Sequence, residues 1–164
     1  LKKSIIRMMD RLNPKRIVIV SSAPQIRYPD CYGIDMAKLE GLVAFRAVLE
    51  LLKDTNQYHL VDDVYKKCKQ QEKYKDGEIV NYVKEIYAPF TNQEISDKIA
   101  IMLSSSDIKA EIKIIFQTVE NLHVSCPNHL GDWYFTGNYP TPGGNRVVNR
   151  AFMNFYEGKD ARAY

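Results

Sequence analysis

A short run of branched apolar residues, from Arg16 to Val20, constrains the fold of this chain more than any other feature. It reads RIVIV and shows no alternation of polar and apolar residues, which is typical of a strand covered on both faces. Before it, residues 1–12 place Leu1, Ile5, Met8, Met9 and Leu12 at helical spacing, and Asn13-Pro14 ends that helix. A helix that leads into a buried strand predicts one step of an α/β layer.

The middle of the chain predicts further helices. A loop over residues 21–35 leads into a helix expected from about Met36 to Asp54, with Asp35 as its N-terminal cap. Residues 57–87 predict two helices that are broken near Asp76-Gly77, and the sequence Thr91-Asn92-Gln93-Glu94 has the form of a capping box that opens another.

A second strand is predicted over Ile112 to Phe116, followed by a loop-rich stretch from Cys126 to Gly144. We expect Asn145 to cap a last helix that ends at Gly158. Gly143-Gly144 before that helix permit an anion site at its N-terminus, but a plain junction between loop and helix is the preferred interpretation. The predicted order is thus helix, buried strand, helices, second strand and C-terminal helix.

Composition excludes several classes of protein. The chain has 23 lysines and arginines against 20 acids, and this net charge of +3 is too small for the basic surface of a nucleic-acid binder, even with eleven tyrosines. No apolar run reaches the roughly 18 residues that a membrane-spanning helix needs. We therefore expect no nucleic-acid partner and no membrane insertion.

No motif in the residues themselves indicates an active site. The three cysteines, Cys31, Cys68 and Cys126, lack CxxC spacing, so we expect reduced thiols in a cytoplasmic protein. No two of the three histidines have the spacing of a helical metal pair. The acid pair Asp62-Asp63 follows two apolar residues but leads into a lysine-rich helical pattern with no glycine or threonine to hold a phosphate, so it predicts a solvated helix face.

Two longer stretches carry a family resemblance. Residues 20–36, VSSAPQIRYPDCYGIDM, resemble the segment that follows the phosphoribosyl-pyrophosphate loop of glutamine amidophosphoribosyltransferases, and residues 134–141, YFTGNYPT, resemble the C-terminal segment of that family. The resemblance is strong over about residues 1–50 and 130–158. It is weak between 55 and 125, where we expect a helical insertion at about 57–90.

The resemblance implies a fragment of a type I phosphoribosyltransferase-like α/β fold. Residues 1–125 would be the C-terminal part of the phosphoribosyltransferase domain, and residues 126–164 a tail with the terminal helix. The complete enzyme makes 5-phosphoribosylamine from glutamine and magnesium-bound phosphoribosyl pyrophosphate, the first step of purine synthesis. Its cysteine nucleophile, acid pair and glycine/threonine loop are absent from these 164 residues, so we expect the chain to be inactive without the N-terminal glutaminase and phosphoribosyltransferase parts.

Some members of the family hold a four-iron cluster on cysteines. The resemblance places three of those cysteines at the positions of Asp30, Gly131 and Tyr134, none of which can supply a thiolate. We expect no iron–sulfur cluster and no other cofactor in this chain, and magnesium only in the complete enzyme.

The loop after the first strand is the expected ligand vicinity, since α/β folds bind ligands at the carboxyl ends of their strands. Its candidate residues also have structural explanations, such as Asp35 as a cap and Pro24 as a turn residue. They are Ser21, Ser22, Pro24, Tyr32 and Asp35.

Two predictions about partners remain. A strand cut from its sheet would leave an unpaired edge, so we expect self-association by edge pairing or by exchange of N-terminal elements. The alternative to an enzyme fragment is a stand-alone regulatory or interaction module of the same architecture.

Overall fold

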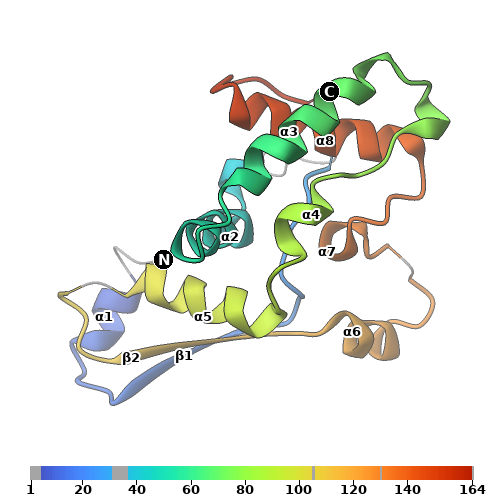
Figure 1. The fold of residues 1–164 in the computed structure, drawn as a ribbon. Coiled ribbons are helices and arrows are strands. Elements are labelled where there is room, and N and C mark those ends of the chain that lie inside the picture. The colour runs from blue at the N-terminus through green and yellow to red at the C-terminus, as the bar shows by residue number, and fades with distance from the viewer. Residues whose placement is uncertain (1–4, 31–36, 105, 130, 164) are drawn as a thin grey trace.

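The computed structural model describes residues 5–30, 37–104, 106–129 and 131–163. Strand β1 (Arg16–Ser21) pairs in parallel with β2 (Glu111–Phe116), in a register that runs from Arg16 opposite Glu111 to Ser21 opposite Phe116. Helix α5 (Asn92–Leu103) lies along one face of this pair, as Figure 1 shows. Both predicted strands are confirmed, and so is the α/β class.

The other face of the sheet is exposed among these residues. Ile17, Ile112 and Ile114 are buried on the α5 side, whereas Val18, Val20 and Ile115 are 46%, 70% and 45% exposed. The prediction that the first strand is covered on both faces is therefore wrong for the part of the chain described here. Apolar side chains are present on both faces, but the described helices cover only one of them.

Helix α1 (Arg7–Asp10) is anchored by a polar contact. The Asp10 carboxylate accepts the backbone N–H groups of Lys109 and Ala110, at 3.0 and 2.8 Å, just before β2 begins. Beside it, Ile6 is buried at 1% exposure.

The apolar stripe predicted for this segment does not form its buried face. Ile5, Met8, Met9 and Leu12 are all at least 45% exposed, because Ile6 and Asp10, one turn apart, face the fold instead. Leu1 lies outside the described residues.

Helix α2 (Val43–Asp54) begins later than the expected Met36. A 3₁₀ turn, η3 (Leu39–Gly41), precedes it, and Leu42 between them has the extended dihedrals φ −82° and ψ 118°. The prediction ran a continuous helix through Gly41, but the buried side chains of Leu39 and Leu42 hold the chain in this turn. The proposed cap Asp35 lies outside the described residues.

The segment expected as a helical insertion folds into one long helix and several short ones. These are α3 (His59–Gln70), the 3₁₀ turns η4 (Gln71–Lys73) and η5 (Asp76–Glu78), and α4 (Lys84–Tyr87). The predicted break near residue 76 is confirmed, but the second helix is only four residues long. The buried amide of Gln71 exchanges two hydrogen bonds with the backbone of Val80, which replaces helical bonding in this stretch.

Asp62 and Asp63 lie on the solvent-facing side of α3, as predicted. Asp62 accepts a hydrogen bond of 2.8 Å from the Tyr156 hydroxyl, and Asp63 pairs with Lys66 at 3.3 Å.

The capping box of α5 is also confirmed. The Thr91 hydroxyl accepts the backbone N–H of Glu94, and the Glu94 carboxylate accepts the backbone N–H of Thr91.

The described residues after β2 form the helices α6 (Val119–Ser125), α7 (Trp133–Thr136) and α8 (Pro142–Tyr156). Helix α8 starts at Pro142 after the cap residue Thr141, not at Asn145. Asn145 instead donates to the carbonyl of Ile79 at 2.9 Å. Proline suits a first helical position because its missing N–H has no helical partner there. The predicted end near Gly158 is confirmed by its φ of 66°.

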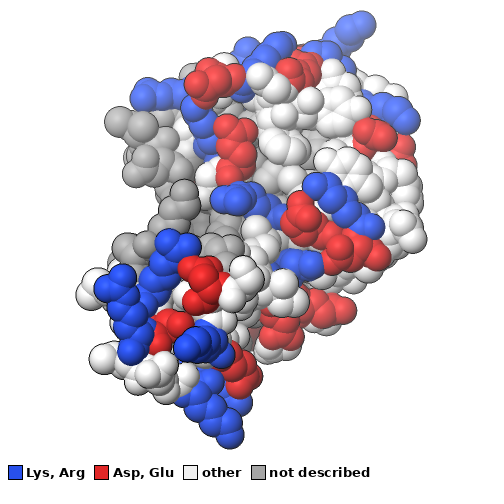
Figure 2. Space-filling view, turned by 90° about the vertical axis from the view of Figure 1, so that its left-hand side faces the viewer, with Lys and Arg blue, Asp and Glu red and all other residues white. Residues whose placement is uncertain are grey.

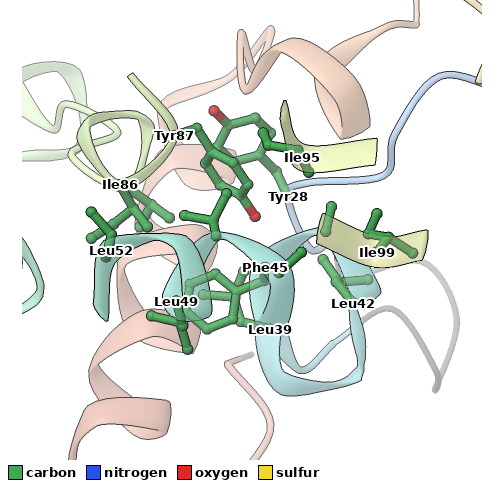
Figure 3. Packing of buried hydrophobic residues seen from close by; sticks show 14 of the residues in the cluster. Tyr28, Leu39, Leu42, Phe45, Leu49, Leu52, Ile86, Tyr87, Ile95 and Ile99 are labelled. Carbon is green, nitrogen blue, oxygen red and sulfur yellow. The ribbon is translucent and has the colours of Figure 1, made fainter. Parts of the chain in front are cut away.

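One hydrophobic core joins these elements. Phe45 of α2 is fully buried in it, with Leu52 near Ile86 of α4 and Leu42 beside Ile99 of α5 (Figure 3). The core contains residues from Ile6 to Ala163, so it includes side chains from both sides of the predicted domain boundary at residue 126. That boundary stays a prediction.

Charges on the surface are mixed. On the face seen in Figure 2, lysine and arginine side chains are interspersed with aspartate and glutamate. One ion pair of the surface joins Arg7 to Asp107 at 2.6 Å. Among the described residues, no helix is both long and apolar enough to cross a membrane.

Candidate functional site

The loop after β1 carries the residues that were expected near a ligand. Ser21 closes the first turn, because its hydroxyl donates to the carbonyl of Ala23 at 2.9 Å and accepts the Ala23 N–H at 3.3 Å. Pro24 is buried and Ser22 is exposed. Ser21 and Pro24 line a cavity of about 260 Å³ beside Phe116, whereas Ser22 does not. Tyr32 and Asp35 lie outside the described residues.

The two segments that resemble the family meet in space. The carbonyl of Tyr134 in α7 accepts the backbone N–H groups of both Arg27 and Tyr28, at 2.9 and 3.0 Å. The hydroxyl of Tyr139 donates to the carbonyl of Pro29. Segments more than a hundred residues apart are thus joined by two backbone bonds and by one bond from a tyrosine side chain.

Gly137 closes this junction. It follows α7 with φ 69°, a left-handed conformation that favours glycine. A side-chain carbon at this position would lie 2.7 Å from Asn81 Nδ2 and 2.8 Å from Tyr28 Cζ. Asn81 also donates to the Gly137 carbonyl at 3.1 Å, which links the insertion to the junction.

The resemblance assigns cluster cysteines to the positions of Asp30, Gly131 and Tyr134, and none of these three side chains carries a thiol. Asp30 is buried, and its carboxylate accepts a hydrogen bond of 2.7 Å from the indole Nε1–H of Trp133. The Trp133 ring lies 3.2 Å from where a side chain on Gly131 would begin. The indole therefore occupies space between positions that would need thiolates. Across the described residues, no three His, Cys, Asp or Glu side chains are grouped to hold a metal.

A cleft of about 550 Å³ lies beside this junction. It runs from Arg27 and the first turn of α5 along β2 from Lys113 to Phe116, and on to Thr118 before α6. Of the three expected site residues that the structure describes, Ser21, Ser22 and Pro24, only Pro24 lines it. The cleft lies at the carboxyl end of the strands, where the α/β rule places ligands.

Arg27 is the functional candidate that sequence reasoning did not single out. It stands inside the SSAPQIRYPD motif, but its surroundings come from α4 and α5, more than fifty residues away. The Thr91–Glu94 capping box was the one available signal, because it fixes where α5 begins. Nothing in the sequence pairs that turn with Arg27.

The histidines do not assemble a site. His123 of α6 lies 3.2 Å from the carboxylate of Asp132, which also accepts from the Thr136 hydroxyl at 3.1 Å. The imidazole Nε2 makes no hydrogen bond in this arrangement, so the pair shows only that α6 lies beside the residue that precedes α7.

Comparisons with known proteins give two curated relatives. The chain is 28% identical over 120 residues to amidophosphoribosyltransferase from Saccharomyces cerevisiae, a match that covers 68% of this chain and 24% of that protein. It is 42% identical over 43 residues to amidophosphoribosyltransferase from Haemophilus influenzae, covering 26% of this chain and 8% of that protein. No protein-family model and no solved structure matches it. The chain is thus similar to about a quarter of one curated amidophosphoribosyltransferase and to a shorter stretch of another.

Proposed function

We propose that this chain is the C-terminal part of an amidophosphoribosyltransferase, a cytoplasmic glycosyltransferase that uses phosphoribosyl pyrophosphate and glutamine to make 5-phosphoribosylamine for purine synthesis. The observation that carries the proposal is the junction of the two motif segments, in which Tyr134 accepts the N–H groups of Arg27 and Tyr28. Similarity to two enzymes of that name supports it.

In this proposal the chain forms part of the fold of the enzyme and does not carry the groups that react. The nucleophile, the acid pair and the phosphate loop are absent from its sequence, so glutaminase and transferase parts of the same protein must supply them. Magnesium belongs to that phosphoribosyl-pyrophosphate site.

The test compares the isolated chain with a complete protein that contains it. With magnesium and phosphoribosyl pyrophosphate, the complete protein should release pyrophosphate when given glutamine or ammonia, whereas residues 1–164 should release none with either. Ammonia serves as a control because it bypasses the glutaminase. Activity of the isolated chain would refute its inactivity, and a complete protein that fails with both nitrogen donors would refute the family assignment.

We further propose that the protein holds no iron–sulfur cluster and that the Asp30–Trp133 hydrogen bond joins the two segments instead. Protein purified without oxygen should be colourless and contain no stoichiometric iron. Trp133→Phe, which removes the indole donor and leaves buried Asp30 with one bond fewer, should lower the free energy of unfolding by about 1–3 kcal/mol. A visible absorption band with bound iron, or an unchanged stability in Trp133→Phe, would contradict this proposal.

Self-association is the third part of the proposal. The exposed side chains of Val18, Val20 and Ile115 lie on a sheet whose only described partner strands are β1 and β2. Such a surface pairs readily with another chain. Light scattering at micromolar concentration should give a mass above that of the 18.9 kDa monomer.

A pair of lysine substitutions locates the contact. Val20→Lys should restore the monomer mass, because a charge on an edge strand opposes pairing. Val124→Lys, at an 80% exposed position on α6, should leave the assembly unchanged. A wild-type chain with the mass of a monomer would contradict the prediction of self-association through this sheet.

A further inference from the structure

Arg27 is held in one orientation by neutral partners. Its Nε and Nη2 donate to Gln25 Oε1 at 3.2 and 2.7 Å, and Nη2 also donates to Asn92 Oδ1 at 2.5 Å. The guanidinium lies over the Tyr87 ring, 5.3 Å from its centroid, and the Tyr87 hydroxyl donates to the Arg27 carbonyl at 2.7 Å. Backbone and side chain of this arginine are therefore both fixed before any ligand arrives.

The Gln25 amide cannot turn its other end toward the arginine. Gln25 is 5% exposed, and its Nε2 already donates to the carbonyl of Asn92 at 2.7 Å and to Ser96 Oγ at 2.8 Å. Both amide hydrogens are thus used in the first turn of α5, so Oε1 must face Arg27. The network has one consistent arrangement of donors and acceptors.

This arrangement leaves the charge of Arg27 uncompensated. Within the described residues, no carboxylate lies within ion-pair distance of it, and the partners that it does have are amide oxygens and an aromatic ring. Of the five guanidinium hydrogens, Nε–H and the two on Nη2 have acceptors, which leaves the two on Nη1. Burial also disfavours the charged form and lowers the pKa of Arg27 from its ordinary value. Partly buried charges normally have an ionic partner, and Arg27 has none among the residues that the structure describes.

The surroundings show where that partner belongs. Arg27 lines the 550 Å³ cleft at the carboxyl ends of the strands, together with Lys113, Gln117 and Thr118. Glu120 is the acidic residue among the described lining residues, against the two cations Arg27 and Lys113. The volume is within the range of small-molecule sites.

We infer that this cleft is a binding site for a small molecule bearing a phosphate group, which Arg27 contacts through Nη1. A phosphate dianion matches the unpaired guanidinium, and Lys113 and the polar side chains of Gln117 and Thr118 suit the rest of a polar ligand. The site stands on the geometry of this chain alone and does not depend on the proposed enzyme function.

The experiment measures the affinity of inorganic phosphate for the purified chain by calorimetry, at constant ionic strength with chloride as the competing anion. We expect saturable binding to the wild-type chain, and a dissociation constant at least tenfold higher for Arg27→Met. Arg150→Met, which removes an exposed arginine of α8 outside the cleft, should bind like wild type. A parallel titration with acetate tests whether the site accepts any oxyanion, and equal affinity for acetate would overturn the assignment to phosphate.

Loss of fold in Arg27→Met would obscure that comparison, so a second measurement uses the wild-type chain only. Phenylglyoxal modifies accessible arginines, and peptide mapping reports each position separately. Phosphate should slow modification of Arg27 at least threefold and leave Arg150 unchanged. Equal protection of both arginines, or none, would overturn the proposal, as would phosphate binding that survives in a folded Arg27→Met variant.

Discussion

Replacing Gly137 by alanine should be among the most damaging single changes in this chain. The left-handed φ of 69° costs an alanine about 1–2 kcal/mol, and the new carbon must displace Asn81 and Tyr28 from contacts of 2.7 and 2.8 Å at a further cost of about 1–3 kcal/mol. We expect the free energy of unfolding, measured by urea denaturation, to fall by about 3 kcal/mol or more.

Gly158→Ala is the matched control. Gly158 has nearly the same φ, 66°, but nothing lies within 4 Å of the position where a side chain would begin. This variant should lose only the backbone cost, about 1–2 kcal/mol. Equal losses in the two variants would mean that the contact of Gly137 with Asn81 and Tyr28 does not constrain the junction of the two motif segments.

Phe45→Ala should have the second large effect. Phe45 is fully buried and contacts two aromatic rings of α8 edge-on, Phe152 with centroids 6.2 Å apart and Phe155 at 4.9 Å. Removing the ring leaves a cavity between α2 and α8, and such deletions cost roughly 3–5 kcal/mol. The measurement is again urea denaturation followed by far-ultraviolet circular dichroism.

Val43→Ala provides the comparison within the same helix. Val43 is 39% exposed in the first turn of α2, so its truncation should change stability by about 0.5 kcal/mol or less. If both variants unfold at the same urea concentration, α2 and α8 do not share one cooperative core.

The local signals in the sequence were reliable where a few neighbouring residues decide the structure. The capping box at Thr91–Glu94 and both strands appear where they were predicted, because cap geometry and β-branched runs depend on adjacent residues. The same reasoning failed at Asn145, whose side chain bonds to Ile79 rather than to its own helix. The sequence alone does not show whether an asparagine near a helix start caps that helix or bonds to a distant segment.

The sequence by itself identified residues 20–36 and 134–141 as the two segments that carry the family resemblance, but it did not show that they contact each other. Periodicity gave helix 1–12 an apolar stripe that includes Met8, yet the structure buries Ile6, which lies outside that stripe, and leaves Met8 exposed. Likewise, Arg27 and Asn92 are 65 residues apart, and they meet because α5 packs on the sheet whose strand β1 leads into the loop of Arg27. Local propensity fixes elements, whereas the choice of buried face and the assembly of a site depend on which surfaces come together when the chain collapses.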